Sequence, residues 1–133
     1  MAGHPLTESL TILVAEDDYQ LQEMLEEALT EAGFRPQILS SAEEAATVLK
    51  SGLYEFRALV ADVNLKGKTS GWDLARLVRE RDPEFPVVYM TGAAADEWAR
   101  LGVPKSILLT KPFAPAQLVT AVSQLLNMGS APL

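Results

Sequence analysis

Side chains capable of chemistry follow four short apolar runs of this sequence, at the point where each run ends. They are Glu16, Asp17 and Asp18 after residues 12–15, Asp62 after residues 58–61, Thr91 after residues 87–90, and Lys111 after residues 107–110. Short apolar runs bounded by turn residues predict buried parallel strands, and ligands of open α/β sheets bind at the carboxyl ends of such strands. We therefore expect these side chains to converge on one pocket.

The chemistry predicted for this pocket involves a hard cation and a phosphoryl group. Glu16, Asp17 and Asp62 offer the carboxylate oxygens that Mg²⁺ prefers. A bound cation would neutralise the crowded carboxylates and let Asp62 approach an anionic phosphoryl group as a nucleophile. Lys111 would then contact the phosphoryl oxygens as a point charge, and the Thr91 hydroxyl would donate a hydrogen bond to them.

Each of these residues also has a purely structural interpretation. The acids after the first run can cap the helix that follows, Thr91 and Gly92 can form an ordinary turn, and Lys111 can be a solvated surface lysine. We favour the capping interpretation for Asp18. The joint arrangement of the other residues favours function, because each falls at the end of a predicted strand.

Composition restricts the class of protein. The 133 residues fit one domain with a substantial apolar core. Cysteine is absent and the single His4 lies in a polar stretch, so a metal would have oxygen ligands. The net charge of -7 argues against nonspecific nucleic-acid binding. No apolar stretch approaches the roughly 20 residues needed to span a bilayer, and no secretory signal is recognisable. We expect a cytoplasmic protein that binds neither nucleic acid nor membrane.

Helical spacing of apolar residues and capping signals predict five helices that alternate with five strands. The predicted helices cover residues 21–32, 45–50, 72–82, 93–101 and 115–126, and a further strand is predicted at residues 37–39. The second helix opens with a capping-box signature at Ser41 and Glu44. Alternation of this kind predicts right-handed crossovers and one parallel α/β sheet covered by helices on both faces.

The ordered pattern of site residues resembles the receiver domain of two-component response regulators over about residues 10–127, leaving residues 1–9 and 128–133 as loose tails. That family carries an acidic pair, a phospho-accepting aspartate, a Thr or Ser followed by a small residue, and Lys-Pro, in this order. The resemblance implies a single doubly wound five-stranded sheet with five helices, in the flavodoxin-like order 2-1-3-4-5.

By position, the resemblance gives each site residue a role. It implies Asp62 as the phosphorylated aspartate, Glu16 and Asp17 as metal-binding acids beside Asp62, Asn64 as the donor of a backbone carbonyl to the metal, Thr91 as the switch hydroxyl, and Lys111 as the phosphate-contacting lysine. The implied cofactor is Mg²⁺, with Mn²⁺ as a substitute. A cis peptide bond between Lys111 and Pro112 is also implied.

The function implied by the resemblance is transfer of a phosphoryl group onto Asp62 from the phosphohistidine of a sensor histidine kinase or a histidine phosphotransfer protein. The receiver would then change conformation to signal to a protein partner, or act in a phosphorelay, as a monomer or weak dimer. Such a protein is not an enzyme beyond its own phosphoryl uptake and autodephosphorylation. Only 22 residues follow Lys111, so no output domain is expected.

Two alternatives stay open. One is a receiver-like protein-binding module that works without phosphorylation. The other is a Mg²⁺-dependent aspartyl phosphatase, which is disfavoured because Asn64 stands where such phosphatases place a second aspartate as the general acid.

The chain departs from the usual receiver pattern at two places. Leu108 occupies the position three residues before the lysine, where receivers commonly carry Tyr or Phe. The segment after Asp62 lacks the frequent proline, is about one residue longer, and contains Lys66 and Lys68, for which we favour a solvated loop over steering of an anionic donor. Trp72 is interpreted as a core residue rather than as part of the site's rim.

Overall fold

The computed structural model describes residues 9–93 and 95–128, and within them five strands and five helices alternate along the chain. The parallel strands β1 (Thr11–Ala15), β2 (Arg35–Leu39), β3 (Phe56–Asp62), β4 (Val87–Thr91) and β5 (Ile107–Thr110) form a sheet in the order β2-β1-β3-β4-β5. The helices are α1 (Tyr19–Glu31), α2 (Ala42–Ser51), α3 (Gly71–Arg81), α4 (Ala95–Leu101) and α5 (Pro115–Met128). The predicted fold class and strand order are confirmed.

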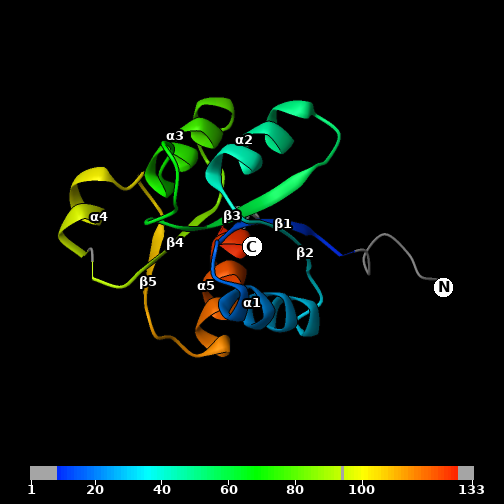
Figure 1. Ribbon diagram of the computed structural model, residues 1–133. Coiled ribbons are helices and arrows are strands. Elements are labelled where there is room, and N and C mark those ends of the chain that lie inside the picture. The colour runs from blue at the N-terminus through cyan, green and yellow to red at the C-terminus, as the bar shows by residue number, and fades with distance from the viewer. Residues whose placement is uncertain (1–8, 94, 129–133) are drawn as a thin grey trace.

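The sheet is sandwiched between two helical layers (Figure 1), with α2 and α3 on one face and α1 and α5 on the other. Side chains alternate between the faces along each strand. Thus Leu13 and Ala15 belong to the core on the α2 and α3 face, together with Trp72, whereas Ile12 and Val14 belong to the core on the opposite face. The central strands are buried on both faces, which explains their nearly continuous apolar sequence.

The helix starts show which capping signals operate. Asp18 is the N-cap of α1, and its side chain accepts a hydrogen bond from the Leu21 N–H, as predicted. The Ser41 hydroxyl accepts from the Glu44 N–H at the start of α2, but the Glu44 carboxylate accepts from Ser40 instead of Ser41. A reciprocal capping box, formed by Ser70 and Asp73, is found at the start of α3, where it was not predicted.

Element boundaries differ modestly from the predictions. Strand β2 begins two residues earlier and includes Pro36, which an edge strand tolerates because it lacks a neighbour on one side. Helix α5 continues to Met128, two residues beyond the predicted end. Of the predicted loose tails, residues 1–8 and 129–133 lie outside the described residues. In the part of the chain that is described, no helix combines the length and apolar character needed to cross a membrane.

The first turn of α3 lies directly against the end of β3. A Cβ atom at Gly71 would stand 2.2 Å from the backbone carbonyl oxygen of Asp62 and 3.0 Å from the Cα of Val63. The next residue, Trp72, is buried and packs its ring against Tyr89 with 4.6 Å between ring centroids, which confirms its interpretation as a core residue. A glycine at position 71 therefore lets α3 support the end of the strand that carries Asp62.

We expect Gly71→Ala to lower the free energy of unfolding by about 1–3 kcal/mol, because the added methyl group must push α3 away from β3. Urea denaturation followed by circular dichroism measures this change. Gly92→Ala is the matched control, since a Cβ atom there meets nothing within 4 Å. Equal losses of stability in the two variants would contradict the explanation.

Candidate functional site

The carboxyl ends of four strands bring the predicted site residues to one edge of the sheet. Glu16 follows β1, Asp62 and Thr91 end β3 and β4, and Lys111 follows β5. The Lys111 N–H donates to the Thr91 carbonyl at 2.7 Å, which holds the end of β5 beside β4. The convergence predicted from the strand ends is therefore found in the structure.

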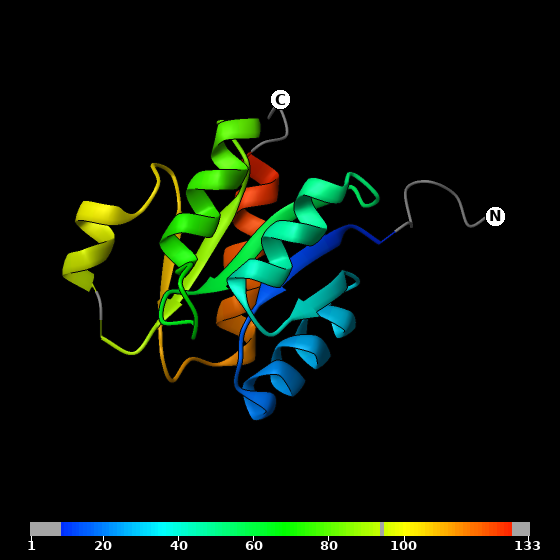
Figure 2. The same cartoon turned by 45° about the horizontal axis from the view of Figure 1, so that its top comes forward.

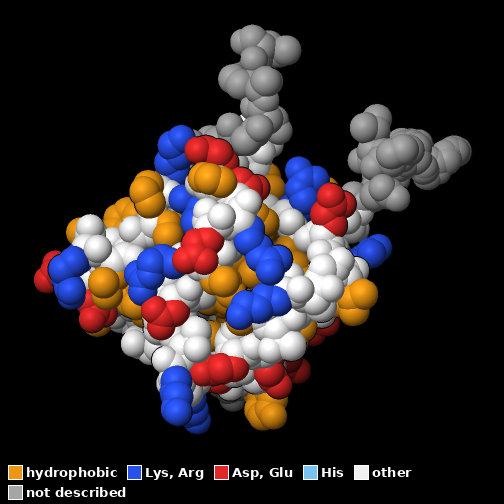
Figure 3. All heavy atoms as spheres, turned by 90° about the horizontal axis from the view of Figure 1, so that it is seen from above, with side chains coloured by type: hydrophobic (Ala, Val, Ile, Leu, Met, Phe, Trp, Pro, Cys, Tyr) orange, Lys and Arg blue, Asp and Glu red, His pale blue; other side chains and the backbone are white. Residues whose placement is uncertain are grey.

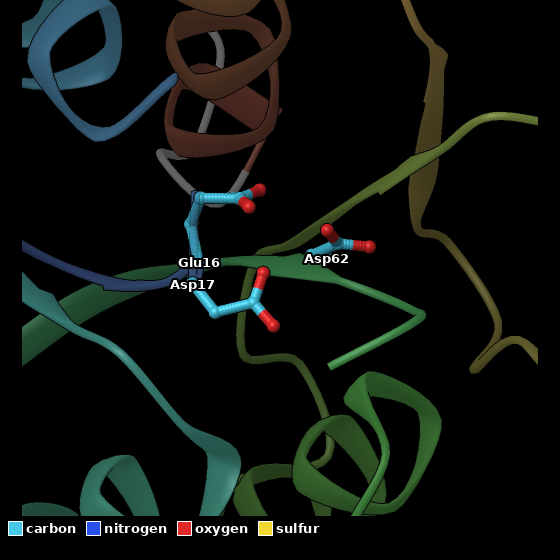
Figure 4. A group of neighbouring side chains, drawn as sticks. All are labelled: Glu16, Asp17 and Asp62. Carbon is cyan, nitrogen blue, oxygen red and sulfur yellow. The ribbon is translucent and has the colours of Figure 1, made fainter. Parts of the chain in front are cut away.

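Three carboxylates form the acidic part of the site. Glu16 and Asp62 are buried and Asp17 is half-buried, and each offers an oxygen within 4.8 Å of the others. Figure 4 shows the Glu16 and Asp17 side chains extending from the end of β1 toward Asp62 at the end of β3. Carboxylates this close repel one another, so the cluster favours a cation.

Lys111 supplies a positive charge to this cluster. Its Nζ lies 2.7 Å from Asp62 Oδ2 and 3.4 Å from Glu16 Oε1. Burial alone would lower the pKa of Lys111, but its hydrogen bond to Asp62 and the negative charges of Asp62 and Glu16 raise the pKa above its ordinary value. Lys111 is thus the counter-ion of the acceptor carboxylate and not a freely solvated surface lysine.

One lysine does not compensate the site fully. Burial raises the pKa of Glu16 to about 7, and the negative charge of Asp62 adds to this shift, whereas the Asp18 N–H and Lys111 oppose it. Three acids facing one lysine form a set of hard oxygen donors with excess negative charge. Such a set suits Mg²⁺ or Mn²⁺. Glu16, Asp17 and Asp62 are the side chains that could hold the ion.

The backbone around Asp62 is also part of the site. The Asn64 N–H donates to Asp62 Oδ1 at 2.8 Å, which places the Asn64 backbone beside the acceptor carboxylate. Its carbonyl remains a predicted metal ligand. The Thr91 side chain is buried, and its Oγ1 accepts the Ala93 N–H at 3.3 Å.

Two features in and just after the fifth strand bear on the family resemblance. The peptide bond between Lys111 and Pro112 is cis, as the resemblance implied. Leu108 is half-buried, lies in register with Tyr89 on β4 and packs toward the core on the α2 and α3 side. The Tyr89 hydroxyl accepts the Val103 N–H at 3.1 Å, and its ring packs against Trp72, so β4 carries an aromatic residue beside Leu108.

The structure adds residues that the sequence did not single out as part of the site. Gln22 Nε2 donates to the Glu16 carbonyl and, at 3.2 Å, to Ser40 Oγ. Glu43 accepts hydrogen bonds from Lys68 and Thr69 in the loop after Asp62. Glu43 drew notice only as part of a helix start, because a contact across 25 or 26 positions of the chain leaves no local signal.

Comparison with known proteins supports the same family. The chain matches the model of the response regulator receiver domain over residues 12–123. Transcriptional regulatory protein CusR of Escherichia coli K12 is 29% identical over 92% of this chain and 53% of its own length. Probable transcriptional regulatory protein SilR of Salmonella typhimurium is 32% identical over 91% of this chain and 53% of its own length. The chain thus spans about half the length of these curated relatives.

Solved structures agree with this result. A response regulator receiver protein from Sinorhizobium medicae WSM419 is 49% identical, with a TM-score of 0.87 over 90% of this chain and 96% of that chain. A putative response regulator from Chloroflexus aurantiacus J-10-fl is 31% identical, with a TM-score of 0.77 over 90% of this chain and 98% of that chain. Together with the acids and the lysine at the strand ends, these matches show that the chain belongs to the response regulator receiver family of two-component signal transduction.

Proposed function

We propose that this receiver accepts a phosphoryl group on Asp62 from a phosphohistidine donor. The observation that supports this most directly is the environment of the Asp62 carboxylate. It is held at a strand end between the Asn64 N–H at 2.8 Å and Lys111 Nζ at 2.7 Å, beside two further acids. A carboxylate that is fixed in place and paired with a cation suits attack on an anionic phosphoryl group.

In the proposed transfer, an Asp62 oxygen forms a bond to phosphorus while the bond between phosphorus and the donor's imidazole nitrogen breaks. The electron pair of the broken bond stays on the imidazole, which is then protonated. Lys111 leaves its contact with the free carboxylate and pairs with the phosphoryl oxygens, and the Thr91 hydroxyl donates a hydrogen bond to them. Water later hydrolyses the acyl phosphate.

Glu16, Asp17, Asp62 and the Asn64 carbonyl are the proposed ligands of Mg²⁺ or Mn²⁺. When bound, the ion would supply positive charge that offsets the carboxylates and the incoming phosphoryl group. The all-oxygen donor set and the closeness of its three carboxylates support this assignment. The chain's own residues orient Asp62 and hold the compensating lysine.

The proposed partners are a sensor histidine kinase or a histidine phosphotransfer protein as donor, and a protein that reads the phosphorylated state. CusR and SilR are named transcriptional regulatory proteins, and about half of each lies outside the match to this chain. The net charge of -7 supports output through protein contacts rather than nucleic acid. On the face over α2 and α3, basic and acidic side chains of the described residues are interspersed, without a continuous basic patch of the kind that nucleic acid would require (Figure 3).

We also propose that the chain catalyses only its own phosphoryl uptake and loss. A phosphatase acting on another substrate would need a proton donor two residues after the nucleophile. Asn64 occupies that position, and its amide cannot serve as a general acid.

Phosphorylation of Asp62 is tested by intact mass after incubation with acetyl phosphate and Mg²⁺. We expect the wild type to gain one phosphoryl group. Asp62→Asn should gain none, because an amide oxygen is a poor nucleophile, and EDTA should abolish the gain in the wild type. A wild type that stays unmodified under all conditions would support the alternative of a binding module that works without phosphorylation.

Loss of the lysine should expose the electrostatic imbalance of the site. We expect Lys111→Met to lower the free energy of unfolding in EDTA, because Asp62 and Glu16 lose their counter-charge. Breaking a fully buried ion pair lowers the free energy of unfolding by about 3–5 kcal/mol. The decrease should be smaller here, since the Lys111 side chain is 29% exposed.

Urea denaturation of Lys111→Met in the wild-type and Asp62→Asn backgrounds gives the coupling between the two residues. The cost of removing the lysine should be smaller in the Asp62→Asn background, where one carboxylate is already neutral. Equal costs in the two backgrounds would show that the ion pair does not stabilise the fold.

A further inference from the structure

The loop between β3 and α3 is held by carboxylates from three different places in the chain. Its N–H groups donate to Asp62 Oδ1 from Asn64, to Asp17 Oδ2 from Lys66 at 3.3 Å, and to Glu43 Oε2 from Lys68 and Thr69. Two of these three acids are proposed metal ligands. The third, Glu43, is exposed and lies in the first turn of α2, outside the acidic cluster.

Glu43 binds the loop closely. The Lys68 and Thr69 N–H groups both donate to the same carboxylate oxygen at 2.9 Å. Between the two anchored parts of the loop, Gly67 has a φ of 110°, which side chains rarely permit, and a Cβ atom there would stand 2.9 Å from Glu43 Oε1. The N–H donors, that of Thr69 first, lower the pKa of Glu43, so the carboxylate stays ionised at neutral pH.

The contacts of Glu43 bear on the metal site through the loop itself. The segment that ends at Thr69 begins with Asn64, the proposed carbonyl ligand. Within this segment, the Lys66 N–H donates a hydrogen bond to the Asp17 carboxylate. Helices α2 and α3 lie side by side on one face of the sheet in both ribbon views (Figures 1 and 2). Glu43 thus connects the start of α2 to the far end of the loop that leads away from the acceptor.

We propose that Glu43 is a positioning residue of the phosphorylation site, which holds the β3–α3 loop so that the Asn64 carbonyl and the Asp17 carboxylate are ready to meet the cation. This inference rests on the proposed function of the site. Glu43 touches neither the cation nor the phosphoryl group. Glu43 orders the loop before the cation binds, so that cation binding requires less additional ordering.

A role in positioning has a distinct kinetic consequence. Without the two hydrogen bonds to Glu43, part of the ordering of the loop has to occur when the cation binds, so the cation binds more weakly. Once the cation is bound, Asp62, Lys111 and Thr91 are unchanged. The half-saturating Mg²⁺ concentration therefore changes, while the phosphorylation rate at saturating Mg²⁺ does not.

The experiment measures the rate of phosphorylation by acetyl phosphate across a Mg²⁺ titration. For Glu43→Ala we expect the half-saturating Mg²⁺ concentration to rise about tenfold, the lower end of the range for residues that support metal ligands. The saturated rate should stay within about twofold of the wild type, a rough allowance since no reacting group is altered. Glu43→Gln keeps one carbonyl acceptor, so its half-saturating Mg²⁺ concentration should lie between those of the wild type and Glu43→Ala.

Glu44→Ala is the matched control. It removes an acid from the same helical turn, and the described contact of the Glu44 carboxylate is with the Ser40 N–H, not with the loop. We expect its half-saturating Mg²⁺ concentration to equal that of the wild type. An equal rise in Glu44→Ala and Glu43→Ala would overturn the proposal, because it would trace the effect to the charge or stability of α2.

Two measurements keep this test separate from the proposed function. Amide hydrogen exchange at Lys68 and Thr69 should become faster in Glu43→Ala, and Mg²⁺ affinity can be followed from the amide resonances of Asp17 and Asn64 without any phosphodonor. If the wild type binds Mg²⁺ but is never phosphorylated, the proposed function fails while the affinities still test Glu43. The positioning role would be overturned if exchange became faster without a change in Mg²⁺ affinity, or if exchange did not change. If Glu43→Ala does not fold, Glu43→Gln provides the same comparison.

Discussion

Negative charge buried at the carboxyl edge of the sheet is the constraint on which the functional site depends. Ionised carboxylates are costly to remove from water unless they are paired, and here Glu16 and Asp62 share the Lys111 ammonium group at 3.4 Å and 2.7 Å. Lys111 reaches them because its backbone N–H is bound to the Thr91 carbonyl at the end of β4. The pairing of β4 and β5 is therefore part of the electrostatics of the site as well as of the fold.

The parallel sheet explains why the chemistry lies at this edge. Its central strands are buried on both faces between two helical layers, so polar side chains can reach solvent only where a strand ends. Alternation along each strand commits neighbouring residues to opposite faces, which fixes the helices on both sides. The resulting scaffold is rigid at the strands and leaves adjustment to the loops that follow them, which is the usual arrangement for binding sites on α/β folds.

The loop after Asp62 departs from the usual receiver pattern. It lacks the proline common in receivers. Its N–H groups donate hydrogen bonds to carboxylates that lie just after β1, at the end of β3 and in the first turn of α2. Gly71 then allows α3 to approach the Asp62 carbonyl, and Trp72 packs the helix start onto Tyr89. Leu108 holds the position usually occupied by an aromatic residue, and its neighbour in register on β4 is Tyr89.

The sequence by itself determined the fold class, the alternation of strands and helices, and the identity of the clustered side chains. Apolar runs that end in Glu16, Asp62, Thr91 and Lys111 are local signals, and parallel strands necessarily bring their carboxyl ends to one edge. The strand order came from family resemblance.

Only the tertiary structure decided which groups meet: Lys111 with Asp62 and Glu16 across the sheet, Glu43 with the loop before α3, and Gly71 against the Asp62 carbonyl. These contacts join residues far apart in the chain or depend on the distance between two backbones. Periodicity and capping signals extend over only a few residues. They therefore could not predict contacts between distant residues or the distance between two backbones.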